Sequence, residues 1–318
     1  MVSTFDFSRK LSETNTHLSS SSQSDKKNDE GNLQILGYSI YWKKFRVPDG
    51  VRSEGKVLCL HGGPGLTHEY MLAFADLARF GYEVFFYDQL GCGKSELPKN
   101  KALFTIERAV EEVERVRRGL NLGKIHLLGS SYGGLLAIAY ALKYQRNLKS
   151  LISISGLDNV PLAISEMDRM KSNLPEDARA VLEKYEEGGE YDNPEYQNAL
   201  MVFYKKHFCR LDEWPRELLA SLEHVSKDVF LTMNGPTEFA IIGNIRYWNV
   251  TKKLGSIRVP TLVTCGRYDE VSPKVAESIH RGIKGSKFVR FEKSSHLAMW
   301  EERDRCMRVV ADFLGGVR

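Results

Sequence analysis

The segment KIHLLGSSYGGLLAIAYALKYQ, residues 124–145, contains two apolar runs joined by a short glycine-rich turn. The first run, residues 124–129, is compact and apolar, which predicts a buried strand of a largely parallel sheet. The second, from about 134 to 145, is longer, which predicts a helix. A buried strand that passes directly into a helix is a basic unit of an α/β fold.

The turn between the two runs carries the strongest chemical pattern in the chain. Gly129, Ser131 and Gly133 match Gly-x-Ser-x-Gly in the strand-to-helix setting of a nucleophilic serine, whereas Ser130 does not fit the register. Side chains at the two glycine positions would collide with neighbouring backbone. The turn is expected to lift the Ser131 hydroxyl above the sheet edge. It also points the Tyr132 amide and the helix N-terminus at the same place, where negative charge is favoured.

Segments of these two kinds alternate along most of the chain. Strands and helices in alternation imply a doubly wound, mostly parallel α/β sheet. Residues 33–45 alternate apolar and polar positions around Gly37, which predicts an antiparallel strand pair at the start. The predicted strands that follow are 56–60, 83–88, 124–129, 148–155, 258–266 and 287–292, and the predicted helices are 68–81, 104–122, about 134–145, near 273–283 and near 301–314.

The alternation stops at residues 157–250, which look mostly helical and hold 17 acidic against 10 basic residues. We interpret this stretch as a helical cap inserted into one core, which comprises residues 33–156 and 251–318. Within residues 1–32, residues 9–32 are rich in Ser, Lys, Asp and Asn and poor in large apolar side chains. Such a segment buries too little surface to offset its ordering entropy, so a disordered extension is predicted.

The overall composition excludes several classes of protein. The chain has 318 residues, 42% of them hydrophobic, and a net charge of +4, which is no nucleic-acid footprint. No apolar stretch is long enough for a membrane span, and the first residues do not resemble a signal peptide. Five widely spaced cysteines fit a reducing cytosol, and no clustered Cys/His pattern indicates a metal. The expected protein is cytoplasmic, with no cofactor, metal, nucleic acid or membrane partner.

A serine nucleophile needs a base and an orienting carboxylate, in the chain order Ser, Asp or Glu, His for this type of turn. His296 follows the predicted strand 287–292, and Asp269 follows the predicted strand 258–266. Both lie at carboxyl ends of parallel strands, where ligands bind in open α/β sheets. Asp158 is the main rival for the acid, but its loop opens the cap, so Asp269 is preferred, a choice that also leans on the family resemblance given below.

A second glycine-rich loop follows the strand 56–60. The sequence His61-Gly62-Gly63-Pro64-Gly65 can expose a backbone N–H to a developing oxyanion, beside the amide of Tyr132. It is not a phosphate loop, because no Gly-Lys-Ser/Thr occurs there.

These motifs together resemble the proline iminopeptidase family of α/β-hydrolases. The resemblance rests on HGGPG, on DQLGCGKS (88–95), on GSSYGG and on the Asp and His loops, and it covers roughly residues 33–315. Within the family, NGPTEF (234–239) and YDE (268–270) are most similar to the aminopeptidase that works with the tricorn protease. The resemblance implies an α/β-hydrolase fold with a helical cap. It also implies an oxyanion hole at the amides of Gly63 and Tyr132, and a substrate amino terminus bound by Glu238 and Glu270.

The expected function is a serine aminopeptidase that releases N-terminal residues, with proline as one candidate, from short peptides through an acyl-enzyme. Carboxylates suit this task because they hold a free ammonium group by charge-assisted hydrogen bonds. An amidase acting on amino-acid amides could use the same triad and anchor. A small-molecule esterase remains open, whereas an epoxide hydrolase would need a carboxylate at position 131. A non-catalytic binding protein on the same fold is a further alternative.

The sequence leaves the strictness of any proline preference undecided. A proline ring needs an apolar pocket, but an aromatic-rich helical segment is more often core than pocket. The available aromatic side chains of the cap are Phe203, Tyr204, Phe230, Phe239, Tyr247 and Trp248.

Overall fold

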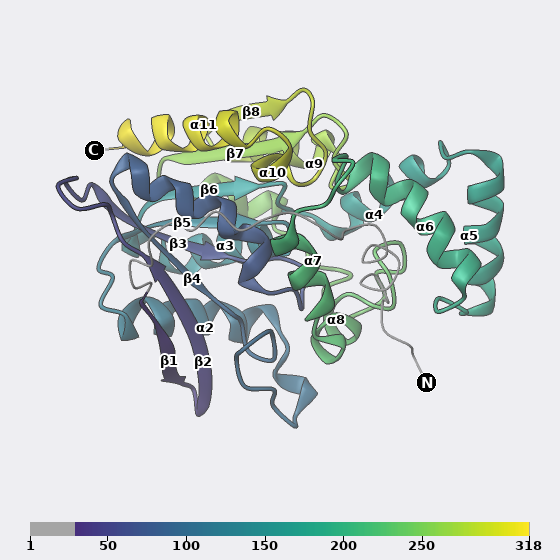
Figure 1. Cartoon of the computed structure of the whole chain (residues 1–318), viewed down its shortest axis with the longest axis horizontal. Helices are drawn as coiled ribbons and strands as arrows, with labels where there is room; N and C mark the ends of the chain where they lie inside the picture. The colour runs from purple at the N-terminus through teal and green to yellow at the C-terminus, as the bar shows by residue number, and fades with distance from the viewer. Residues whose placement is uncertain (1–28, 318) are drawn as a thin grey trace, which may run out of the picture.

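The computed structural model describes residues 29–317, and their centre is one eight-stranded sheet (Figure 1). The strands lie in the order β1-β2-β4-β3-β5-β6-β7-β8. β1, β2 and β4 are antiparallel neighbours, and every pair from β4 to β8 is parallel. The strands are β1 (Asp29–Ile35), β2 (Tyr38–Phe45), β3 (Gly55–Leu60), β4 (Tyr82–Tyr87), β5 (Ile125–Ser130), β6 (Leu148–Ile154), β7 (Thr261–Gly266) and β8 (Lys287–Phe291).

Helices connect the parallel strands and cover the sheet, so the α/β fold predicted from the alternation is confirmed. α3 packs on β5 and β6, α2 packs on α3, and α9 packs on β7 and β8. The core helices are η2 (His68–Phe80), η3 (Lys101–Leu103), α2 (Ile106–Gly119), α3 (Tyr132–Tyr144), η4 (Gln145–Asn147), η5 (Thr251–Ser256), α9 (Pro273–Gly282), α10 (Ala298–Glu301) and α11 (Arg303–Gly315).

The central strands are buried on both faces. Every residue of β5 and of β7 is buried, as is the second half of β3. This is why these runs are continuously apolar instead of alternating. Their carboxyl ends meet at one edge of the sheet, and the residues that follow β5, β7 and β8 are those carrying Ser131, Asp269 and His296.

Five α-helices, α4 to α8, lie within the stretch interpreted as the cap, and η5 follows them before β7. In Figure 1 they gather beside one end of the sheet, with α5 farthest from it. An isolated bridge between Asn159 and Asn249 joins the start and the end of this stretch. The cap helices are α4 (Val160–Lys171), α5 (Glu176–Gly188), α6 (Pro194–His207), α7 (Arg216–Glu223) and α8 (Lys227–Met233).

The first strand begins at Asp29, four residues before the predicted start of the core at residue 33. The composition predicted too late a start for this strand, because its polar residues are held by hydrogen bonding to β2 and not by apolar burial. Asp29 pairs with Arg46, and the Glu30 carboxylate accepts a hydrogen bond from the Tyr41 hydroxyl at 2.6 Å. The rest of the predicted extension, residues 1–28, lies outside the described residues. Within residues 29–317, no helix has both the length and the apolar character of a membrane span.

Candidate active site

The turn between β5 and α3 holds Ser131 in a conformation that few residues other than glycine adopt, with φ 58° and ψ −126°. The flanking glycines are required by close contacts. A Cβ atom at Gly129 would lie 2.0 Å from the carbonyl oxygen of Gly133, and one at Gly133 would lie 2.0 Å from the carbonyl oxygen of Leu60. Ser131 is half-buried, and its amide donates to the carbonyl of Ile154 at 2.9 Å. The strained serine is therefore held by packing on both sides.

Asp269 and His296 form a buried pair. The Nδ1 atom of His296 lies 2.7 Å from Oδ1 of Asp269. Oδ1 of Asp269 also accepts the amide of Val271 at 2.9 Å, while Oδ2 accepts the Ser155 hydroxyl at 2.5 Å. Both carboxylate oxygens are engaged, which fixes the orientation of the carboxylate, and the imidazole is held through Nδ1.

Asp158, the rival acid, is used elsewhere. Its Oδ2 atom accepts hydrogen bonds from the hydroxyls of Thr251 at 2.6 Å and Ser278 at 2.9 Å, and its backbone carbonyl accepts the amide of Val250 at 2.8 Å. These contacts tie the beginning of the cap to its end and to α9. Burial raises the pKa of the Asp158 carboxyl.

Glu270 faces His296 from the other side of the imidazole. One carboxylate oxygen, Oε1, lies 3.7 Å from Nε2 of His296. The other, Oε2, is buried and has no hydrogen-bond partner within residues 29–317. Burial raises the pKa of Glu270 well above its ordinary value, and the neighbouring charge of Glu238 raises it further. A buried carboxylate with an unpartnered oxygen is costly unless a ligand supplies the missing donor.

Glu238 belongs to the same cluster, although it comes from the loop that follows α8. Burial raises the pKa of Glu238 to about 7, against the opposing effect of His296. Burial by itself lowers the pKa of His296, but Asp269, Glu270 and Glu238 together outweigh it and raise the pKa to about 9. Three acids thus act electrostatically on one imidazole, and two of them, Asp269 and Glu270, are buried, an arrangement suited to a cation.

His207, the last residue of α6, joins the cap to this cluster and is not among the site residues predicted from the sequence. Its carbonyl oxygen accepts the amides of both Glu270, at 3.0 Å, and His296, at 3.2 Å. Its Nδ1 atom lies 2.7 Å from the carbonyl oxygen of Tyr268, and the ring of the next residue, Phe208, stacks on His296 with centroids 5.8 Å apart. No sequence pattern marks this residue, because its contacts with Glu270 and His296 are made by its backbone carbonyl.

The aromatic residues of the cap separate into two groups. Phe203, Tyr204 and Phe239 are buried, and Phe203 packs edge-on against Phe239 with centroids 4.7 Å apart. Tyr247, in contrast, is 79% exposed, and Trp248 is half-buried over α2 and α3. Phe239, whose apolar ring is buried, directly follows Glu238 in the sequence.

The HGGPG loop lies beside the nucleophile turn. Gly63 has φ +110°, and a Cβ atom at Gly62 would lie 2.8 Å from the Cβ atom of Ser131. Within residues 29–317, neither the Gly63 amide nor the Tyr132 amide, the first of α3, donates a hydrogen bond. An oxyanion hole needs two such unengaged N–H groups beside a serine hydroxyl.

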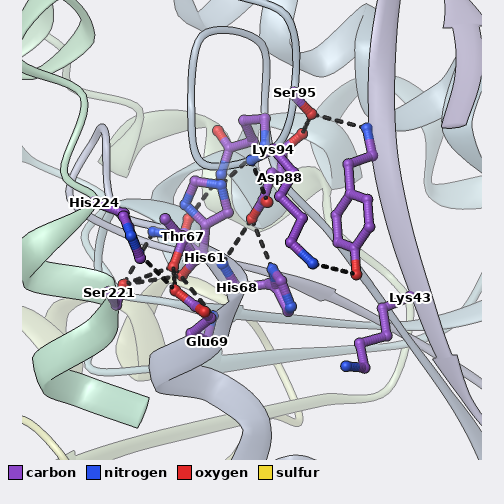
Figure 2. Close-up of polar contacts among 12 residues, drawn as sticks. Lys43, His61, Thr67, His68, Glu69, Asp88, Lys94, Ser95, Ser221 and His224 are labelled. Atoms are coloured by element: carbon purple, nitrogen blue, oxygen red, sulfur yellow. Dashed lines mark hydrogen bonds and ion pairs between the residues drawn. The ribbon is translucent and has the colours of Figure 1, made fainter. Parts of the chain in front are cut away.

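The DQLGCGKS segment braces the same region, as Figure 2 shows around Asp88. Asp88 Oδ1 accepts the amide of His68 and lies 2.8 Å from its Nδ1 atom, while Oδ2 accepts the amide of Lys94 at 3.0 Å. Gly93 allows the tight turn, because a Cβ atom there would lie 2.4 Å from the Asp88 carboxylate. This motif acts on the start of η2 and does not reach the Asp269–His296 pair.

Comparisons with known proteins agree with this architecture. A family model described as alpha/beta hydrolase fold matches residues 56–303. Proline iminopeptidase from Thermoplasma volcanium is 48% identical over 288 residues, which cover 90% of this chain and 96% of that protein. The one from Saccharolobus solfataricus is 47% identical over 291 residues, covering 91% and 93%. The crystal structure of proline iminopeptidase from Mycobacterium smegmatis is 30% identical, with a TM-score of 0.85 over 90% of this chain and 98% of that one.

Proposed function

Because the chain belongs to the proline iminopeptidase family of α/β-hydrolases, we propose that it removes an N-terminal proline from short peptides by an acyl-enzyme mechanism on Ser131. It is a serine-hydrolase-type peptidase. The assignment of the site residues depends most on the environment of Glu270. This buried carboxylate has one oxygen without a hydrogen-bond partner among the described residues, and its other oxygen lies 3.7 Å from Nε2 of His296.

In the proposed reaction, the substrate ammonium binds between Glu238 and Glu270, which supply the acceptors that a free amino terminus needs. Ser131 attacks the first carbonyl carbon, and its proton passes to Nε2 of His296, which Asp269 orients through Nδ1. The tetrahedral oxyanion is stabilised by the amides of Gly63 and Tyr132.

Collapse of this intermediate transfers the proton from His296 to the leaving amine. Water, deprotonated by His296, then attacks the acyl-enzyme and releases the amino acid. We propose that the cap, whose helix α6 ends at His207 against Glu270 and His296, limits access to short peptides. The five cysteines are free and buried, which supports a reducing compartment such as the cytosol.

A substrate panel tests this function directly. We expect turnover of proline arylamide to exceed that of alanine arylamide, and we expect N-acetyl-proline arylamide to be resistant because it carries no ammonium group. Prolinamide and a simple ester complete the panel. Preferred hydrolysis of prolinamide would indicate an amidase, and preferred hydrolysis of the ester would contradict the proposal.

Replacing either Glu238 or Glu270 by glutamine should lower kcat/KM for proline arylamide about 100-fold, since each change removes a charged partner of the ammonium group. The matched control is Glu277→Gln, which removes the same charge from an exposed pair with Arg281. Steady-state kinetics on purified variants measure the effect. Equal loss on a substrate that has no amino group would show that the carboxylates do not act as the anchor.

The raised pKa of His296 gives the ligand-free site a distinct pH dependence. His296 is a base only when neutral, so phosphonylation of Ser131 by a fluorophosphonate should become faster as the pH rises through about 9. Glu270→Gln removes one cause of the elevation and should move the midpoint to lower pH, whereas Glu277→Gln should leave it in place. The measurement is the labelling rate between pH 6 and 10, and coincident profiles for wild type and Glu270→Gln would refute this coupling.

A further inference from the structure

The peptide group between Gly62 and Gly63 carries the Gly63 N–H, one of the two proposed oxyanion donors. A peptide group is planar and its N–H and C=O point in opposite directions when it is trans, so whatever holds the carbonyl also aims the N–H. The carbonyl oxygen of Gly62 lies 3.1 Å from Nδ1 of His61. His61 therefore contacts the group that aims the donor.

The tautomer of His61 follows from its other contact. The backbone amide of Gln89 donates to Nε2 of His61 at 3.0 Å, so Nε2 is an acceptor and the ring hydrogen lies on Nδ1. Burial lowers the pKa of His61 to about 4, which keeps the ring neutral at physiological pH. Nδ1 thus donates to the Gly62 carbonyl.

The preceding peptide group, between His61 and Gly62, is held at both ends. Its carbonyl, that of His61, accepts the side-chain amide of Gln89 at 2.8 Å. Its N–H, that of Gly62, donates to the hydroxyl of Tyr70 at 2.8 Å. The same hydroxyl lies 3.5 Å from the carbonyl oxygen of Ser130, in the nucleophile turn. Tyr70 therefore bridges the two loops that supply the two donors.

Tyr70 is itself firmly placed. It is 1% exposed, and burial raises the pKa of its hydroxyl, which therefore remains protonated. Its backbone carbonyl accepts Nε1 of Trp300 at 2.6 Å, from the helix that follows the His296 loop. Two residues earlier, the amide of His68 donates a hydrogen bond to the Asp88 carboxylate, which also contacts the His68 ring. Figure 2 shows this contact beside His61.

We propose that Tyr70 is a positioning residue for the oxyanion hole, acting with Gln89 on the His61–Gly62 peptide to aim the Gly63 amide. The inference rests on the proposed function only in that Ser131 forms a tetrahedral intermediate. Without the Tyr70 hydroxyl, the Gly62 N–H is buried and unsatisfied, and rotation of Gly62 to relieve this redirects the next peptide.

The test compares Tyr70→Phe with Tyr87→Phe. Tyr87 is a fully buried tyrosine of β4 whose hydroxyl has no hydrogen-bond partner within residues 29–317, so the control removes the same atom without removing a contact. Tyr70→Phe should lower kcat for proline arylamide between about tenfold and a hundredfold, less than loss of a direct donor. Tyr87→Phe should remain within about twofold of wild type.

Inhibitor binding separates positioning from general loosening. A proline boronic acid forms a tetrahedral adduct with an oxygen in the oxyanion hole, whereas pyrrolidine reports only on the ammonium site. For Tyr70→Phe, the boronate Ki should rise by the same factor as kcat/KM falls, and the pyrrolidine Ki should stay within about twofold of wild type, given an intact ammonium site. Parallel weakening of both inhibitors, or unchanged kcat, would overturn the inference.

Two further measurements keep the outcome interpretable. Gln89→Met acts on the other end of the same peptide and should produce the same inhibitor pattern, so an unstable Tyr70→Phe does not end the test. The phosphonylation rate of Ser131 reports on the oxyanion hole without any peptide substrate. If proline arylamide is not turned over but Ser131 is labelled, slower labelling of Tyr70→Phe still supports the positioning role while the proposed function fails.

Discussion

Replacing Ser131 by alanine should lower kcat for proline arylamide by about 10⁵-fold, because no other group can form the acyl-enzyme. Binding of substrate should change little, since the ammonium site at Glu238 and Glu270 is untouched. The measurement is kcat on purified protein, together with thermal unfolding to show that the turn at Ser131 is intact.

The neighbouring serine provides the matched control for this prediction. The Ser130 hydroxyl is buried and has no hydrogen-bond partner within residues 29–317, and it lies outside the Gly-x-Ser-x-Gly register. Ser130→Ala should therefore retain kcat within about threefold, because only a small buried polar group is removed. If Ser130→Ala were inactive and Ser131→Ala active, the assignment of the nucleophile would be wrong.

The second large effect is expected at Asp269, where asparagine should lower kcat by about 10⁴-fold. The change preserves shape but places an amide opposite Nδ1 of His296, 2.7 Å from the present carboxylate oxygen. An amide NH₂ in that place favours the tautomer with hydrogen on Nε2, which cannot accept the Ser131 proton. Activity and the pH profile of Ser131 labelling measure the result.

Asp158→Asn is the companion experiment, because Asp158 was the rival acid in the sequence. Its carboxylate binds Thr251 and Ser278, so we expect a loss of about 1–2 kcal/mol in the free energy of unfolding. The value of kcat should stay within about threefold of wild type. A catalytic loss at Asp158 that exceeds the loss at Asp269 would reverse their roles.

The two aspartates also show where sequence patterns stop being informative. Both follow a buried strand at the same sheet edge, and chain order allows either to be the acid. Only the packed structure shows that the Asp158 carboxylate accepts hydroxyl hydrogens at the base of the cap, while Asp269 lies against His296. A shift of a few ångströms in the position of a side chain changes its hydrogen-bond partner, and the spacing of residues along the chain does not specify such positions.

Tyr70 and His207 were not found in the sequence for a related reason. Tyr70 acts through a hydroxyl that meets a backbone amide eight residues away, and His207 acts through its backbone carbonyl. Neither contact requires a characteristic residue pattern. The DQLGCGKS motif was recognised as a family signature, yet its physical role, bracing the start of η2 and the His61 ring, was visible only in the fold.

The amino-acid sequence alone determined the alternation of strands and helices, the glycines at 129 and 133 and the position of Ser131 on its turn. These are local properties, set by the period of apolar residues and by the absence of a Cβ where backbone approaches backbone. The tertiary structure decided which acid meets His296 and which residues brace the oxyanion loop. It also gathered Glu238, Glu270 and Asp269 around one imidazole. Those contacts join segments up to 60 residues apart, and burial then changes the charge state of the groups it brings together.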